Sequence, residues 1–363
     1  MPSVIEHFSR TRVDHTTLQV MADAQQGLGR LIEEEQSVIR HYVRVGTWPH
    51  KCVNMFVFED LQPLTSQIKR AITLSSVIAE DIDRRPMVNV YDAADLSECA
   101  VFVNRRLLEQ DGAWGDRLSL RALLAHEHGH PLAENKAVQA ARALSVEIKE
   151  GAPPRKKVIA PILQLLADRL CVHAPQEVFA NEIAIRAGFG EALFHLDRDV
   201  VEKACLSVTK RPILVESLGR KVANGKLCAD QAARLLFVGD LQAHLGFALE
   251  TAPFLRAGHD RQAEALEAAL SRGVWDHLDP AVKRLYEALR DHYRRLTPDL
   301  TSAQTEAWAG EAVALLTDAL QQKNLRVRFE LARTRAVPKR SRGPKSAPMS
   351  ARDSVPDSDG GTL

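Results

Sequence analysis

The chain has no stretch of about 18 uninterrupted apolar residues, and its first residues lack a charged segment followed by an apolar one. We therefore expect no membrane-spanning helix, no secretory signal and no membrane partner.

Cysteine is also scarce. The five cysteines are odd in number and none has C-x-x-C spacing: Cys52, Cys99, Cys171, Cys205 and Cys228. This usage favours reduced thiols in a cytoplasmic protein over a disulfide framework.

An excess of charge of one sign is absent too. The 48 Lys and Arg residues balance 47 Asp and Glu residues, so the net charge of +1 gives no electrostatic attraction to nucleic acid. We expect no nucleic-acid partner.

Aromatic residues make up only 5% of the chain, while Ala, Leu, Arg and Glu are plentiful, which favours a mostly helical fold. The length of 363 residues allows two or three domains with a sizeable core.

One segment carries a chemical motif. Residues 118–130, LSLRALLAHEHGH, combine leucines at helical spacing with a terminal H-E-x-x-H. Either Asp116 or Ser119 is placed to cap the N-terminus of this helix. The alternative interpretation is a coincidental motif at a solvated helix end. The apolar helix ahead of the motif and a matching carboxylate downstream argue against that alternative.

The spacing of the motif suits a metal ion. Positions i and i+4 share one helix face, so His126 and His130 can direct two imidazoles toward one Zn²⁺ ion. Glu127 is one position beyond the first ligand, where its carboxylate can reach a metal-bound water without closing the coordination sphere. His128, at i+2, projects elsewhere and is not expected to be a ligand of this ion.

The third ligand is expected on a second helix that begins near Pro175. There Glu177 and Asn181 lie one turn apart on the same face. The Glu177 carboxylate would complete a His₂Glu zinc site, and the Asn181 amide would fix the tautomer of a ligand histidine. Ala180 is small enough to let the two helices approach closely. Glu182 is the rival carboxylate, but it faces a different direction from Glu177.

The combination of H-E-x-x-H with a later E-x-x-A-N resembles the gluzincin metallopeptidases. It is similar to the ImmA/IrrE-type and HtpX/Ste24-type peptidases, and the resemblance covers residues 87–189 approximately. It implies a zincin-like catalytic domain that hydrolyses peptide bonds with zinc. The chain departs from the pattern at His128, which replaces an apolar residue, and at Pro131, which directly follows the second histidine and should end or kink the helix just past His130. It also lacks the membrane helices of the HtpX/Ste24-type proteins.

The predicted fold is α+β and predominantly helical, with a small β-sheet in the zincin-like core and an all-helical C-terminal region. We assign residues 1–85 to a helical support region, 86–198 to the catalytic domain, 199–335 to a helical accessory domain and 336–363 to a disordered tail. Residues 87–91 and 100–104 are predicted to pair as strands. One of them would hold an extended peptide at the sheet edge, unless both form a plain structural hairpin.

Helices are expected over residues 16–45 and 137–149. In the first of these, the acidic patch Glu33-Glu34-Glu35 is interpreted as a solvated helix face. Residues 53–58 are predicted to form a strand or a buried turn.

The predicted activity is that of a zinc-dependent metalloendopeptidase acting on a peptide or protein substrate. His126, His130 and Glu177 would hold Zn²⁺, and Glu127 would act as the general base toward the metal-activated water. Tyr91 and His195 are both considered as donors to the oxyanion, and the spacing does not choose between them. Two alternatives remain open. One is a regulatory or scaffold protein that acts through protein binding, and the other is a peptidase dedicated to one intracellular regulatory target. The sequence does not define the oligomeric state.

Overall fold

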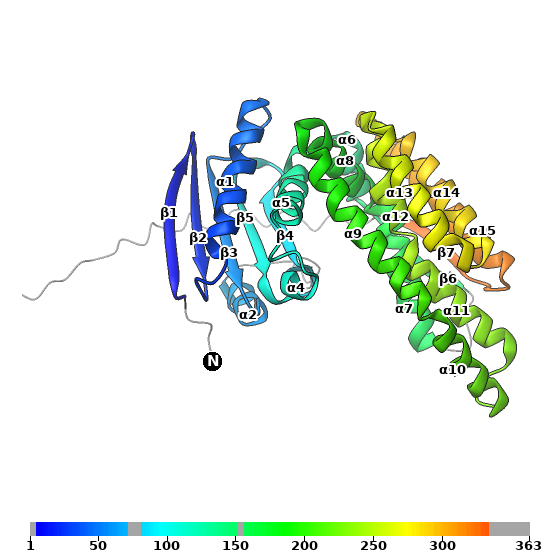
Figure 1. Ribbon diagram of the computed structural model, residues 1–363. Helices are drawn as coiled ribbons and strands as arrows, with labels where there is room; N and C mark the ends of the chain where they lie inside the picture. The colour runs from blue at the N-terminus through cyan, green and yellow to red at the C-terminus, as the bar shows by residue number, and fades with distance from the viewer. Residues whose placement is uncertain (1–4, 72–80, 151–155, 334–363) are drawn as a thin grey trace, which may run out of the picture.

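The computed structural model describes residues 5–71, 81–150 and 156–333. This part of the chain is mostly helical and contains a five-stranded mixed sheet and a two-stranded sheet, in agreement with the predicted α+β, predominantly helical class. The five-stranded sheet lies at one end of the molecule and a stack of long helices at the other (Figure 1). Within the described ranges, none of the helices combines the length and apolarity needed to cross a bilayer.

The five-stranded sheet supplies the frame next to which the histidine motif lies. Its strands are β1 (His7–Val13), β2 (Thr16–Ala22), β3 (Cys52–Phe58), β4 (Met87–Asp92) and β5 (Asp95–Asn104). Their order is β1-β2-β3-β5-β4, with β2, β3 and β5 parallel and the two outer strands antiparallel to their neighbours. The predicted pairing of residues 87–91 with 100–104 is confirmed, and β4 is an edge strand.

Helices cover both faces of this sheet. Helix α1 (Leu28–Arg44) and helix α5 (Arg117–Leu132) share one large core with the inward-facing strand residues. On the other face, a smaller core gathers four buried residues at and near α2 (Gln62–Ala71): Phe58, Leu61, Ile82 and Phe102. The short helix α4 (Arg105–Gln110) follows β5. Helix α5 is therefore held between the sheet and the helices that come later in the chain (Figure 1).

The helix predicted over residues 16–45 is wrong in its first part. Residues 16–22 form β2, and their side chains alternate strictly between buried and half-buried positions, as a strand with one face on the core requires. Helix α1 begins only at Leu28, after Gly27 adopts the left-handed conformation. The N-terminal region thus combines helices with strands. It contributes three strands to the sheet that β4 and β5 complete, so the sheet joins residues on both sides of the boundary expected at 85/86.

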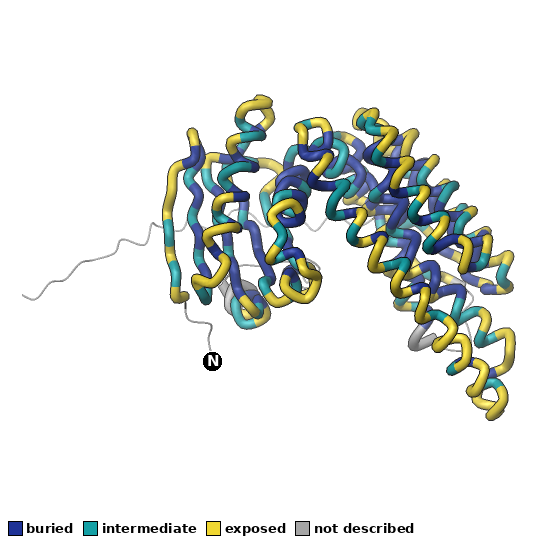
Figure 2. Tube along the Cα trace, in the orientation of Figure 1, coloured by how far each residue is buried: buried dark blue, intermediate teal, exposed yellow. Residues whose placement is uncertain are grey.

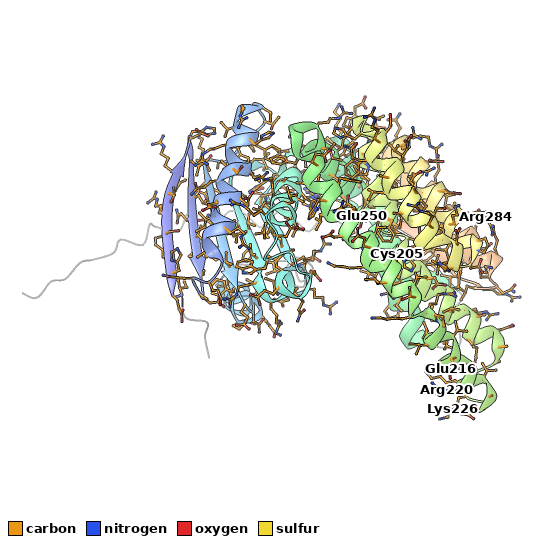
Figure 3. All side chains as sticks on the ribbon, in the orientation of Figure 1. Cys205, Glu216, Arg220, Lys226, Glu250 and Arg284 are labelled. Atoms are coloured by element: carbon orange, nitrogen blue, oxygen red, sulfur yellow. The ribbon has the colours of Figure 1, made fainter. Side chains whose placement is uncertain are left out.

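The later part of the chain is helical apart from one two-stranded sheet. Its elements are α6 (Lys136–Ala141), β6 (Leu144–Glu150), α7 (Lys156–Ala167), α8 (Ala174–Ala184), α9 (Gly190–Thr209), α10 (Arg211–Ala223), α11 (Ala229–His244), α12 (Phe247–Ala257), α13 (Asp260–Gly273), α14 (Pro280–Arg294), α15 (Ser302–Gln322) and β7 (Arg328–Arg333). Helices α9 to α11 extend away from the sheet, and Figure 2 shows the tip of this extension as largely exposed. Glu216, Arg220 and Lys226 lie at that tip (Figure 3).

Two further expectations need correction. The helix predicted over 137–149 ends at Ala141, and the alternation of Leu144, Val146 and Ile148 produces strand β6, which pairs with β7 at the end of the region expected to be all helical. Helix α9 also runs through the domain boundary expected at 198/199. The tail predicted over 336–363 lies outside the described residues.

Candidate metal centre

Helix α5 carries the H-E-x-x-H motif, and its start is fixed by one of the two expected caps. Asp116 is the N-cap residue, and its carboxylate accepts a hydrogen bond of 3.0 Å from the backbone N–H of Leu118. The Ser119 hydroxyl donates to the same carboxylate instead of capping the helix itself. Leu120 and Leu124 are fully buried and anchor the helix in the core. The helix ends at Leu132, with Pro131 in its last turn, as expected from a proline just after the motif.

The three predicted ligands are close together. One donor atom each from His126, His130 and Glu177 lies within 4.8 Å of the other two. The imidazoles of His126 and His130 come from successive turns of α5, with ring centroids 4.6 Å apart. Glu177 comes from the first turn of α8, which packs against α5. Its Oε2 atom is 3.4 Å from Nε2 of His126.

Asn181 has the position expected of a residue that orients a ligand. Its Oδ1 atom is 2.7 Å from Nδ1 of His126, so this ring nitrogen is the protonated one and donates to the amide oxygen. When the ring is neutral, as a metal ligand must be, its lone pair is on Nε2, the nitrogen that faces Glu177. The local sequence explains the contact, because residues 177 and 181 lie one helical turn apart.

Glu127 is held by the edge strand. Its Oε2 atom accepts a hydrogen bond of 2.9 Å from the backbone N–H of Asn89 on β4. The side-chain amide of Asn89 also donates to the backbone carbonyl of Glu127, at 3.1 Å. Glu127 as a whole is 6% exposed. Strand β4 therefore fixes the general-base candidate at both its side chain and its backbone.

The rival carboxylate is engaged elsewhere. Glu182 forms an ion pair with Arg186 at 2.9 Å and another with Arg256 at 2.7 Å. It does not belong to the group formed by the two histidines and Glu177. Of the two acidic residues that the sequence left open, the structure brings only Glu177 to the histidines.

Electrostatics at the site follow from burial and from these contacts. Burial alone lowers the pKa of His126, but the carboxylates of Glu177 and Glu127 outweigh it and raise this pKa to about 9. Burial and the neighbouring His126 lower the pKa of His130 to about 3. Burial alone raises the pKa of Glu177, yet the imidazoles and Arg85 hold that pKa well below its usual range. Without an ion, His126 and Glu177 thus form a charged pair, and a cation bound there would take the place of the His126 proton.

The donor set fits a zinc ion. Two ligand atoms, each about 2.1 Å from a tetrahedral ion, lie about 3.4 Å apart. The Nε2 atom of His126 and the Oε2 atom of Glu177 have this separation. Two imidazoles and one carboxylate are also the set found in catalytic zinc sites that keep one position open. The residues present therefore suit Zn²⁺ in both chemistry and spacing.

Two residues beside the site were not identified from the sequence. Asn89 acts mainly through its backbone N–H, which no residue pattern indicates. Arg85 approaches Glu177 with its Nη1 atom 3.6 Å from Oε1, and it pairs with Asp81 at 3.3 Å. The one signal for Arg85 in the sequence was its position just before β4, the strand that was expected to border the site.

The two residues considered as oxyanion donors have other contacts. The Tyr91 hydroxyl donates to Glu134 at 2.7 Å and accepts from Arg142 at the same distance. His195 is 2.5 Å from the carboxylate of Asp116. Asp116 precedes His126 by ten residues of helix, or about 15 Å along the axis, so His195 lies well away from the candidate centre.

Comparison of the chain with protein-family models, with curated proteins and with solved structures finds no match in any of the three.

Proposed function

We propose that this protein is a zinc-dependent metallopeptidase of the gluzincin type, in which His126, His130 and Glu177 hold the metal and Glu127 is the general base. The observation that carries the proposal is the 3.4 Å separation between His126 Nε2 and Glu177 Oε2, at a site where two imidazoles and a carboxylate converge. The resemblance in the motif supports the same conclusion.

When bound, Zn²⁺ would supply Lewis-acid polarisation of the scissile carbonyl and would acidify a water molecule. Glu127 accepts the proton of the attacking water and later delivers it to the leaving amine. Burial raises the pKa of Glu127 above its ordinary range, which makes the carboxylate a better proton acceptor near neutral pH. Because Asn89 holds Oε2, we assign the proton transfer to Oε1.

Strand β4 is suited to hold an extended peptide. It is an edge strand, and the backbone N–H of Asn89 is directed toward Glu127 and away from β5. In antiparallel pairing, alternate residues share this orientation, so the backbone groups of Met87 and Tyr91 face the same side. A peptide added along this side would lie next to Glu127 and would pair with the backbone groups of Met87 and Tyr91, because Glu127 already accepts from the N–H of Asn89.

The proposal is tested with the full-length protein and its Glu127→Gln variant on a panel of fluorogenic peptides. We expect the wild type to hydrolyse peptides and the variant to lose at least about 10²-fold in kcat/KM, with its zinc content per chain unchanged. Glu182→Gln serves as the control and should remain active. Loss of zinc together with activity in Glu127→Gln would contradict the assigned role. A zinc-loaded wild type that cleaves no peptide of the panel would favour the two alternatives, a regulatory protein or a peptidase dedicated to one intracellular target.

A further inference from the structure

Behind the candidate centre lies a second cluster of metal-binding side chains. His50 precedes β3, Cys99 belongs to β5, and His128 is the residue between the two histidines of the motif on α5. One donor atom of each lies within 4.8 Å of the other two. Both histidines are completely buried and Cys99 is 3% exposed. Residues far apart in the sequence thus meet in the layer between α5 and the sheet.

One nitrogen of each histidine is already bound to an acceptor. His50 Nδ1 is 2.6 Å from the backbone carbonyl of Leu96, and His128 Nε2 is 2.8 Å from the Glu35 carboxylate. A carbonyl can only accept, and an ionised carboxylate does the same, so each of these nitrogens carries a proton and donates it. A neutral ring then has a bare lone pair on its other nitrogen.

Those other nitrogens have no partner. His50 Nε2 and His128 Nδ1 are both buried and make no hydrogen bond within the part of the chain that the structure describes. A buried polar atom without a partner costs about 1–3 kcal/mol, and such atoms are rare in folded proteins. The thiol of Cys99 has one proton, so it can satisfy one of the two lone pairs and not both. A cation among the three atoms would satisfy both.

We propose that His50, Cys99 and His128 form a second, internal metal site that takes a borderline-soft divalent ion, namely Zn²⁺. Imidazole nitrogen and thiolate sulfur are both ligands that zinc takes in proteins, and mixed sets of the two are known. On binding, the Cys99 thiol gives up its proton to solvent, and the sulfur and two ring lone pairs bind the ion. The ligand atoms then approach to about 3.5 Å of one another, as Zn–N and Zn–S bonds of about 2.1 and 2.3 Å require.

The surroundings of the cluster match those of a metal site. Ligand histidines almost always donate their second N–H to a carboxylate or a backbone carbonyl, and Glu35 and the Leu96 carbonyl provide one of each. The Trp48 ring packs against both histidines, with centroid distances of 4.8 Å to each. This packing shields the cluster from water and limits rotation of the two imidazoles.

The internal site would stabilise the helix that carries the candidate centre. His128 alternates with His126 and His130 along α5, so an ion bound to it joins α5 to β5 and to the segment ahead of β3. The inference does not depend on peptidase activity, because a structural ion at this position would stabilise α5 whatever the neighbouring histidines do.

The test uses Co²⁺ as a spectroscopic probe, because only a thiolate ligand gives an intense sulfur-to-cobalt charge-transfer band in the near ultraviolet. The cluster of His126, His130 and Glu177 has no sulfur and cannot produce this band. We expect the band in the Co²⁺-loaded full-length wild type and in Glu177→Ala, and its loss in Cys99→Ser. Elemental analysis after zinc loading should give two ions per chain in the wild type and one in each of these two variants.

A second variant tests whether other cysteines supply the band, so that the assignment does not depend on correct folding of Cys99→Ser alone. The triple variant Cys52→Ser, Cys205→Ser and Cys228→Ser removes the cysteines that are not buried and should keep the band unchanged. The absence of a charge-transfer band from folded, Co²⁺-loaded wild type would overturn the proposal. A band that survives in Cys99→Ser, or disappears in the triple variant, would overturn it as well. In either case the cluster would be a hydrogen-bonded part of the core.

Discussion

Gly129 of α5 lies against the backbone of Ala180 of α8, so closely that a Cβ atom added to Gly129 would be 2.5 Å from the Ala180 carbonyl oxygen. This contact sets the separation of the two helices at the level of the candidate centre. His130 follows Gly129 directly, and Glu177 lies one turn before Ala180. The distance from the carboxylate to the imidazoles therefore depends on a residue without a side chain at position 129.

Gly129→Ala should separate the helices and weaken the site. The new methyl group meets a backbone oxygen, which cannot rotate away, so we expect a destabilisation of about 1–3 kcal/mol and a loss of zinc affinity. Gly219→Ala is the matched control, because Gly219 lies inside helix α10 with open space around it. That substitution should stabilise the protein by about 0.4–1 kcal/mol. Chemical denaturation and zinc competition titrations measure both effects, and similar results for the two variants would refute the packing argument.

Glu177→Ala and Glu182→Ala should separate metal binding from stability. Removing Glu177 takes away a ligand, so zinc at this centre should be lost. Removing Glu182 leaves the buried guanidinium of Arg256 without its carboxylate, which should cost about 1–3 kcal/mol while zinc content stays the same. Elemental analysis and thermal unfolding of the two variants distinguish these outcomes. A zinc content equal to that of the wild type in Glu177→Ala, with one ion fewer per chain in Glu182→Ala, would reverse the assignment.

Asn181→Ala should lower zinc affinity without removing a ligand. The amide oxygen of Asn181 holds Nδ1 of His126, and loss of such a contact typically costs 10- to 100-fold in metal affinity. Asn181→Asp keeps an acceptor oxygen at the same position and should bind zinc at least as well as the wild type. Competition with a chromogenic chelator measures the dissociation constants. Equal affinities for wild type and Asn181→Ala would show that this hydrogen bond does not support the ligand.

The candidate centre could be predicted from the sequence because local rules generate most of it. The i, i+4 spacing of His126 and His130, and of Glu177 and Asn181, fixes which side chains share a helix face. Pairing of the two helices then needed one further assumption, that each carries half of the same site. The contacts with Asn89 and Arg85 follow from where β4 lies, and no spacing in the sequence encodes that.

The N-terminal third was harder to predict, because its apolar residues fit two periods. Leu18 and Met21 lie three residues apart, as on a helix face, yet strand alternation determines the structure of β2. The acidic patch was also misinterpreted. Glu34 and Glu35 are buried, Glu34 pairs with Arg117 and Arg121, and Glu35 binds His128, 93 residues away. Such long-range partners become visible only once the helices are packed together.

Glu250→Gln should change how stability depends on pH. Glu250 lies on α12 in the helical part (Figure 3), and its Oε2 atom is buried without a hydrogen-bond partner in the described chain. Burial raises the pKa of Glu250 to about 7, while the positive charge of Arg169 acts to lower it. A carboxyl with a raised folded-state pKa contributes stability below its unfolded pKa of about 4.3, and this stability is lost as the pH rises through 7. The variant should therefore equal the wild type near pH 4.5 and be more stable at pH 8, by up to about 3 kcal/mol. Burial and the charge of Glu250 both raise the pKa of Asp197. The pKa of Asp197 should therefore fall when Gln replaces Glu250. Urea unfolding at both pH values measures the difference from the wild type, with Glu264→Gln as the control for loss of a carboxyl group at an exposed position of α13.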